Sequence, residues 1–214
     1  FLLDPAAIAR NGGRSEDHPV LVRIPANGRE MNQWMIKNIL DQGAHGIVVP
    51  HGVTAEQALN VVRAMRYPQR PGAPDFEPAG QRGSGPGNAI RYWGVSRDDY
   101  QARADLWPLD PRGELVNVLL IENQLGVANV RAIAQVKGVS IISAAPGDLS
   151  VAYAGDRAAI EEAIQAVLAA CKAFDVPCAI TAGADDVETR IKQGFRVIIT
   201  GGEALRKGRQ IAGR

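Results

Sequence analysis

The sequence predicts an α/β fold of parallel strands, of the (β/α)8 TIM-barrel type, in a single domain over residues 1–214. Two observations support this prediction: short β-branched runs alternate with segments of helical period, and most of these runs are almost continuously apolar. A chain of 214 residues also suffices for one sizeable core but not for two. We therefore expect one parallel sheet covered by helices.

The expected strands are apolar, β-branched runs that end at polar, glycine or proline turns. They are residues 19–25, 46–50, 115–122, 139–144, 177–182 and 196–201. A closed barrel of this type has eight strands, so two are not visible. Because the chain begins inside an apolar run at Phe1, and residues 3–10 resemble the end of a helix, we expect the first one or two β/α units to precede it. A six-stranded doubly wound sheet is the alternative.

Helices are expected between the strands, where apolar residues recur at helical spacing. They are residues 29–42, 54–66, 127–136, 156–174 and 184–193. Thr54 stands three residues before Gln57, which is the pattern of a capping box. Gly43 and Gly194 follow helix ends, where glycine commonly terminates a helix.

Residues 68–112 form a proline- and glycine-rich insertion that interrupts the alternation. Only residues 98–104 have the character of a short helix. Segments of this length inside a compact domain are often functional. The insertion also carries aromatic residues that can pack it against the domain: Tyr92, Trp93, Tyr100 and Trp107. A substrate lid, a subunit contact and a packed insertion are all open alternatives.

Charge and composition exclude several classes of partner. The chain has 24 lysines and arginines against 23 acids, a net charge of +1, so we expect no nucleic-acid or anionic-membrane partner. An apolar run of about 18 residues and a signal-peptide pattern are both absent, which favours a cytoplasmic protein. Cys171 and Cys178 fall at core positions of an expected helix and strand, and we expect both to be reduced thiols.

Two acids at neighbouring strand ends are the most informative pair. Functional groups of parallel α/β folds gather beyond the carboxyl ends of the strands. Glu122 ends the third expected strand and Asp148 follows the fourth, so together they can offer hard oxygen ligands to one divalent cation. The alternative is that both are solvated loop acids or helix caps, since the segment around Asp148 also has turn chemistry.

Three further positions at the strand ends can bind an anion or a proton. Arg23 lies on an apolar strand, and its guanidinium suits a carboxylate, an enolate oxygen or a structural salt bridge. The amides around Gly147 and Asp148 can hold a carboxylate. His51 follows the second expected strand and is a weaker candidate acid or base.

Short segments in a fixed order between Pro19 and Arg214 carry a family resemblance. They are Val22-Arg23-Ile24-Pro25, Leu40-Asp41-Gln42-Gly43-Ala44, Val49-Pro50-His51, Thr54-Ala55-Glu56-Gln57-Ala58, Arg66-Tyr67-Pro68, Arg82-Gly83, Ile121-Glu122-Asn123, Val136-Lys137-Gly138-Val139 and Gly147-Asp148-Leu149-Ser150. Together, in this order, they resemble the HpcH/HpaI aldolase family. The interval from Glu122 to Asp148, 148 minus 122 or 26 residues, fits the spacing of the metal ligands in that family.

The resemblance implies a class II, metal-dependent aldolase that cleaves or forms 4-hydroxy-2-oxo acids through a pyruvate-type enolate. It implies Glu122 and Asp148 as ligands of Mg2+ or Mn2+, with Co2+ or Zn2+ as alternatives. By the same resemblance, Arg23 contacts the keto or enolate oxygen, and the amides of Gly147 and Asp148 hold the carboxylate. Asp41 matches an acid that family members offer to a neighbouring subunit's site, which implies a homo-oligomer, a hexamer by family resemblance.

The family pattern also contains a part that this sequence does not show. Family members place a histidine general base after the second strand of the barrel, so we expect that base upstream of Phe1. The insertion at residues 68–112 is longer than the matching link of many members, so the resemblance names a 2-oxo acid and an aldehyde as partners without identifying the aldehyde. The alternatives are a CoA-thioester C–C lyase, a decarboxylating enolate enzyme, or a non-catalytic ligand-binding barrel.

Overall fold

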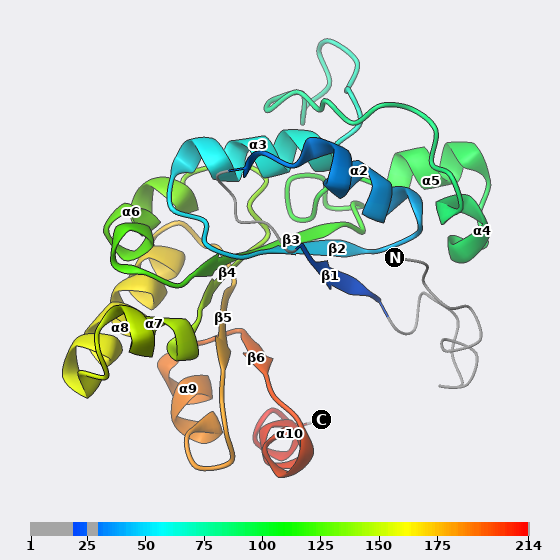
Figure 1. Ribbon diagram of the computed structural model, residues 1–214. Helices are drawn as coiled ribbons and strands as arrows, with labels where there is room; N and C mark the ends of the chain where they lie inside the picture. Colours follow the sequence, from blue (N-terminus) through cyan, green and yellow to red (C-terminus); the bar gives the residue numbers. More distant parts are fainter. Residues whose placement is uncertain (1–18, 25–29, 214) are drawn as a thin grey trace.

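The computed structural model describes residues 19–24 and 30–213, and one parallel sheet forms its centre. The strands are β1 (Leu21–Arg23), β2 (Gly46–Val49), β3 (Val116–Ile121), β4 (Ile141–Ala144), β5 (Cys178–Thr181) and β6 (Val197–Ile199). All neighbours pair in parallel, in the order β1-β2-β3-β4-β5-β6. Figure 1 shows that the sheet curls, with β1 and β6 at its two ends.

Helices cover the convex side of this curled sheet. They are α2 (Gln33–Asp41), α3 (Ala55–Met65), α6 (Gln124–Ala134), α8 (Arg157–Ala173) and α9 (Val187–Gln193), with α7 (Pro146–Ala152) and α10 (Gly202–Ile211) after β4 and β6. Along this side α2 contacts α3, α3 contacts α6, and α6 contacts α8. No helix in the described part of the chain is long and apolar enough to cross a membrane.

The strand order decides between the two expected architectures. A doubly wound sheet reverses its strand order at a switch point and carries helices on both faces. Here strand order follows chain order throughout, and the helices that connect consecutive strands lie on the convex side (Figure 1). The doubly wound alternative is therefore wrong. The described residues form a six-stranded, curled part of a barrel rather than a closed eight-stranded one.

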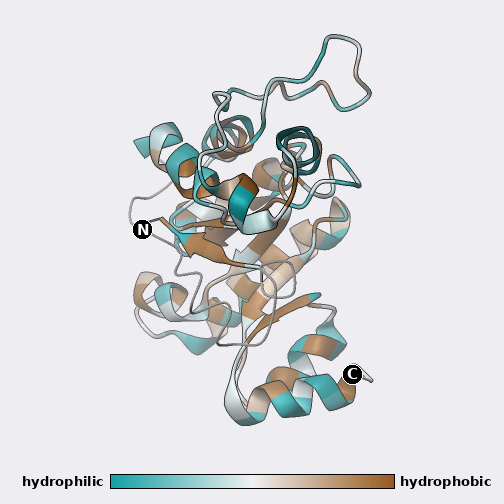
Figure 2. Ribbon diagram, turned by 90° about the vertical axis from the view of Figure 1, so that its right-hand side faces the viewer, coloured by the Kyte–Doolittle hydropathy of each residue, from teal (hydrophilic) through white to brown (hydrophobic). Residues whose placement is uncertain are grey.

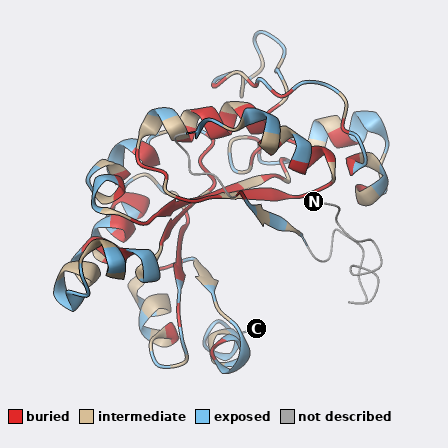
Figure 3. Cartoon of the chain, in the orientation of Figure 1, coloured by how far each residue is buried: buried red, intermediate tan, exposed pale blue. Residues whose placement is uncertain are grey.

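The main core lies between the convex face of the sheet and the helices. Because successive side chains of a strand point to opposite faces, alternate residues such as Ile47, Leu119 and Ile142 join the buried cluster that includes Val61 and Leu168 of the helices. Figure 2 shows the strands as hydrophobic bands. Figure 3 shows that β2 to β4 are mostly buried, whereas β6 and α10 are more exposed.

The expected strands and the helices between them are all present, with ends shifted by a few residues. The Thr54 half of the expected capping box is confirmed, because the Thr54 side chain accepts a bond from the Gln57 amide at 3.2 Å. The Gln57 side chain accepts its bond from the Val53 amide at 2.9 Å, one residue before the cap. Cys171 and Cys178 are free and buried, as predicted. Helices α4, α7 and α10 were not expected, and the helix end expected at residues 3–10 lies outside the described residues.

The insertion packs at the amino ends of the strands. Its helices α4 (Ala89–Trp93) and α5 (Arg97–Arg103) bury Trp93 and Tyr100, which are 2% and 0% exposed. Trp93 Nε1 donates to the carbonyl of Gly43 at 3.0 Å, and its ring stacks on His45 just before β2. This side is opposite to the carboxyl ends of the strands (Figure 1). A packed insertion is therefore confirmed for α4 and α5, whereas a substrate lid and a subunit contact stay predictions.

Candidate active site

The carboxyl ends of four neighbouring strands bring four candidate residues to one edge of the sheet. Arg23 is the last residue of β1, and His51 lies just beyond β2. Glu122 directly follows β3, and Asp148 lies in the first turn of α7, after β4. Two acids, a guanidinium and an imidazole are therefore gathered at the edge where parallel α/β folds place their functional groups.

Glu122 occupies the centre of this group. Its side chain is 0% exposed, and its Oε2 accepts a bond from the His51 amide at 2.7 Å. The His51 Nδ1 lies 3.2 Å from the same oxygen, and Arg23 Nη2 lies 3.6 Å from Oε1. Oε1 has no hydrogen-bond partner among the described residues. The protein therefore holds one carboxylate oxygen and leaves the other available to a ligand.

The electrostatic surroundings of Glu122 favour a bound positive charge. Burial raises the pKa of Glu122, and the negative charge of Asp148 raises it further. The hydrogen bond from the His51 amide and the positive charges nearby lower that pKa without cancelling the effect of burial. A carboxylate held in such a place is typical of functional sites. A cation at Oε1 would supply the charge compensation that the described residues leave incomplete.

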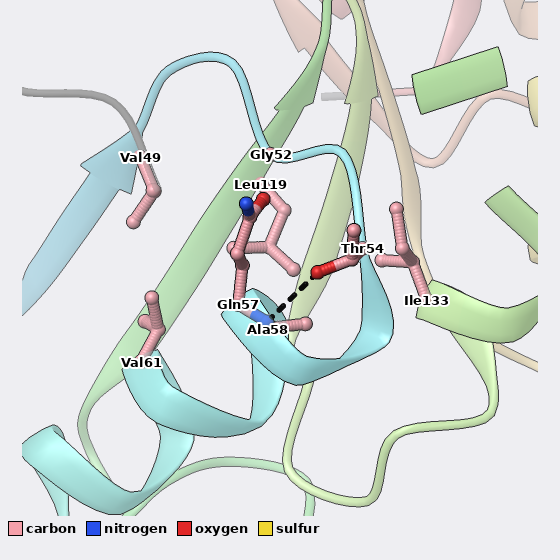
Figure 4. Close-up of a pocket in the computed structure, with 8 residues that line it drawn as sticks. All are labelled: Val49, Gly52, Thr54, Gln57, Ala58, Val61, Leu119 and Ile133. Atoms are coloured by element: carbon pink, nitrogen blue, oxygen red, sulfur yellow. Dashed lines mark hydrogen bonds between the residues drawn. The ribbon is translucent and has the colours of Figure 1, made fainter. Parts of the chain in front are cut away.

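The turn after β2 positions His51 in an uncommon backbone conformation. Its φ is 51°, in the left-handed region that non-glycine residues seldom adopt. Gly52 and the Thr54 cap then lead into α3, as Figure 4 shows. A mostly apolar cavity of about 10 Å3 lies behind this turn, between α3 and Leu119. Because that volume is about the size needed for one water molecule, the cavity is too small for a substrate.

Helix α7 presents free amides beside the two acids. Its first backbone bond within the helix runs from the Leu149 amide to the Ala145 carbonyl at 3.0 Å, so the amides of Gly147 and Asp148 have no acceptor inside the helix. A methyl group placed on Gly147 would meet nothing within 4 Å. The space beside these amides is therefore open to an anionic group such as a carboxylate.

Asp41 lies at the other edge of the sheet. It is the last residue of α2, just before the turn into β2, and it is 7% exposed. Its carboxylate accepts a bond from Arg82 Nη2 at 2.7 Å and pairs with Lys37 one helical turn earlier. Arg82 also donates to the Tyr100 hydroxyl at 2.9 Å. The structure therefore does not bring Asp41 together with Glu122 within one chain.

A second acidic group lies outside the strand-end site. The carboxylates of Asp75, Asp105 and Asp110 are close enough together to hold a metal ion. Arg66, however, is 0% exposed and donates to Asp105 at 2.6 and 2.8 Å and to Asp75 at 3.0 Å. Because this guanidinium pairs with two of the three carboxylates, we interpret it as the anchor that ties the insertion to the end of α3.

His51 contributes more to the site than its sequence context indicates. The segment Pro50-His51-Gly52 has the composition of an ordinary strand exit, so the residue types alone do not select the histidine. Its position does carry a signal, because it follows β2 as Glu122 follows β3, and β2 and β3 are paired. The contact with Glu122 requires the positive φ at His51, which the sequence does not reveal.

Comparison with known proteins supports a common origin with a family of lyases. Residues 13–205 match the family model described as HpcH/HpaI aldolase/citrate lyase. A hydroxypyruvate/pyruvate aldolase of Delftia acidovorans is 37% identical over 195 residues, which cover 86% of this chain and 62% of the relative. A hydroxypyruvate/pyruvate aldolase of Roseobacter denitrificans is 36% identical over 138 residues, 64% of this chain and 45% of the relative. The chain thus spans about half to two thirds of the length of these relatives.

Other relatives match over more of the chain. A 5-keto-4-deoxy-D-glucarate aldolase of Escherichia fergusonii is 31% identical over 206 residues, 94% of this chain and 71% of the relative. Among solved structures, an HpcH/HpaI aldolase/citrate lyase family protein from Burkholderia cenocepacia has a TM-score of 0.70 and 26% identity, covering 90% of this chain and 72% of the other. Macrophomate synthase has a TM-score of 0.60 and 27% identity, covering 91% and 64%.

Proposed function

We propose that this chain, which belongs to the HpcH/HpaI aldolase/citrate lyase family, is a divalent-metal-dependent aldolase. The proposed reaction is the reversible cleavage of a 4-hydroxy-2-oxo acid into a pyruvate-type 2-oxo acid and an aldehyde. The buried Glu122 carries this proposal, because one of its oxygens is held by His51 and the other has no hydrogen-bond partner among the described residues. Relatives named hydroxypyruvate/pyruvate aldolase support the substrate class.

Glu122 and Asp148 are the proposed ligands of the cation. They supply hard carboxylate oxygens, which suit Mg2+ or Mn2+, and the unpartnered Oε1 of Glu122 fits a ligand atom. Co2+ is an alternative, and Zn2+ is less suited because the pair contains no nitrogen or sulfur ligand. A cation bound there would stabilise negative charge on the substrate oxygen as a Lewis acid.

The residues of this chain would stabilise the enolate. In the cleavage direction a base removes the proton of the C4 hydroxyl, the C3–C4 bond breaks, the aldehyde leaves, and the electron pair moves onto the C2 carbonyl oxygen. The Arg23 side chain, 57% exposed beside Glu122, would donate to that oxygen. The amides of Gly147 and Asp148 would hold the carboxylate and orient the C3–C4 bond. Protonation at C3 then gives the 2-oxo acid.

Decarboxylation of oxaloacetate tests the proposed site directly, because loss of CO2 gives the pyruvate enolate without removal of a proton by a base. Glu122→Gln, Asp148→Asn and Arg23→Met are each expected to lower Mn2+-dependent pyruvate release by about 100-fold or more. Asp110→Asn is the matched control, because Asp110 belongs to the acidic group anchored by Arg66. Full activity of the Glu122 and Asp148 variants, or wild-type activity in excess EDTA, would overturn the proposal.

A second assay, which measures carbon–carbon bond formation, separates this proposal from the alternative lyases. A pyruvate aldolase turns over free pyruvate with an aldehyde, whereas a CoA-thioester lyase requires the CoA ester. Turnover of the ester alone would replace the proposed substrate class. Binding of Mn2+ and pyruvate without any turnover would favour a non-catalytic ligand-binding barrel.

Asp41 is proposed to act in the site of a neighbouring subunit, and the protein is accordingly proposed to be a homo-oligomer. Asp41 and Glu122 lie at opposite edges of the sheet, so they cannot meet in one chain. Mixing Asp41→Asn subunits with Glu122→Gln subunits tests this arrangement. Partial recovery of activity supports a shared site. Absence of recovery, with mixed oligomers confirmed by mass spectrometry, would contradict it.

A further inference from the structure

One residue approaches the proposed metal ligand with both its main-chain amide, which donates a hydrogen bond, and its imidazole ring, which lies in close contact. The main-chain nitrogen of His51 lies 2.7 Å from Glu122 Oε2, and its Nδ1 lies 3.2 Å from the same atom. Neither contact involves Oε1, which has no hydrogen-bond partner among the described residues and lies 3.6 Å from Arg23 Nη2. His51 therefore acts on one oxygen of the carboxylate only.

The position of His51 needs an explanation beyond packing. A residue other than glycine in the left-handed region costs on the order of 1 kcal/mol and persists only where the surroundings impose it. The side chain is 44% exposed, so burial does not hold the ring in place. The next residue in this turn is a glycine, Gly52, yet the positive φ belongs to the histidine and not to that glycine.

The turn itself is held independently of Glu122. The Val53 amide donates to the Gln57 side chain at 2.9 Å, and the Val53 carbonyl accepts a bond from Asn129 Nδ2 at 2.8 Å. Because these bonds fix the main chain next to His51, its amide points at Glu122 before any ligand binds. The imidazole adds a second contact to Oε2, at 3.2 Å, that a change of side chain can remove without releasing the turn.

We propose that His51 is a positioning residue that fixes Oε2 of Glu122, so that Oε1 is the single carboxylate atom offered to the divalent cation. This inference rests on the proposed function of Glu122 as a metal ligand. A carboxylate that is held before binding loses less freedom when it coordinates, and partners of metal ligands commonly change metal affinity by about 10- to 100-fold. His51 contributes to the metal site without being a ligand.

Binding of Mn2+ to the metal-free protein, followed by electron paramagnetic resonance, tests the inference without an activity assay. His51→Gly keeps the positive φ and the amide but loses the imidazole, so its Kd for Mn2+ is expected to rise about tenfold. His51→Asn is the rescue variant, because asparagine tolerates the left-handed region and its Nδ2 can take the place of Nδ1 beside Oε2. Its Kd is expected to stay within about threefold of the wild-type value.

The spectrum of bound Mn2+ provides a second readout. A looser Glu122 carboxylate is expected to broaden the signal in His51→Gly, and His51→Asn is expected to restore it. A wild-type Kd and spectrum in His51→Gly would overturn the inference. If Glu122→Gln binds Mn2+ as well as the wild type does, the proposed function fails instead, so the two failures are distinguishable.

Discussion

In the metal-free protein, Glu122→Gln is expected to increase the free energy of unfolding at neutral pH. Burial and Asp148 raise the pKa of Glu122 in the folded state, so the folded protein binds this proton more tightly than the unfolded chain. The stability that this bound proton contributes is fully present below the pKa of about 4.3 in the unfolded chain. It is lost as the pH rises through the pKa of Glu122 in the folded protein. At neutral pH the ionised carboxylate therefore destabilises the fold, and the neutral amide removes that cost.

The size of this effect follows from the buried Oε1, which has no hydrogen-bond partner among the described residues and only the charge of Arg23 at 3.6 Å. A buried acceptor without a partner costs about 1–3 kcal/mol, and each kcal/mol shifts the Tm of a domain of this size by about 2–4 °C. Thermal unfolding in EDTA should show this gain at about pH 7.5 and little of it near pH 4. Excess Mn2+ should stabilise only the wild type. A Glu122→Gln protein less stable than the wild type in EDTA at neutral pH would refute the reasoning.

Glu161→Gln is the matched control, with the opposite sign. The hydrogen bond from Arg190 lowers the pKa of Glu161, so this carboxylate stabilises the fold above its unfolded pKa and loses that contribution as the pH falls through the lowered value. The same substitution is therefore expected to destabilise the protein slightly at neutral pH, because the Glu161 side chain is 43% exposed and solvent screens its charge. Shifts of the same sign in both variants would point to an effect of the amide rather than of charge.

Two further substitutions test other parts of the structure. Arg66→Met should lower the free energy of unfolding in urea by about 3–5 kcal/mol, because it leaves Asp105 and Asp75 without their buried cation. A loss below about 1 kcal/mol would contradict the anchoring role. Gly147→Ala should change stability by less than about 0.5 kcal/mol, because its methyl group meets no protein atom. The same substitution should nevertheless raise the KM for the 2-oxo acid about tenfold, because the added methyl group crowds the amides of Gly147 and Asp148. An unchanged KM would argue against binding of the substrate carboxylate by these amides.

The centre of the sheet could be predicted because its central strands are buried on both faces. Such strands leave almost continuous apolar runs, which is the signal seen around β3 and β4. Helix α10 lacked an equivalent signal, since Ala204 is its one buried residue and two glycines lie within its range. Helix α7 was interpreted as a turn because Pro146 and Gly147 open it, although proline is well tolerated at the first position of a helix.

The candidate site could be predicted in its members but not in its geometry. Arg23, Glu122 and Asp148 were found because strand ends in a parallel sheet share one edge. The sequence could not show which oxygen of Glu122 is free, because that depends on the backbone of His51, 71 residues earlier. Nor could it show that Asp41 pairs with Arg82, since that bond joins α2 to the insertion.

The insertion also has a consequence for how the protein folds. The bond between His51 and Glu122 joins residues 71 apart, so forming it from an open chain closes a long loop. Once Arg66 binds Asp105, only the 15 residues from His51 to Arg66 and the 17 from Asp105 to Glu122 remain to be closed. Since loop-closure entropy grows with the logarithm of length, this halving saves about 0.7 kcal/mol. By binding Arg66 through Asp105, the insertion thus lowers the entropic cost of bringing His51 and Glu122 together during folding.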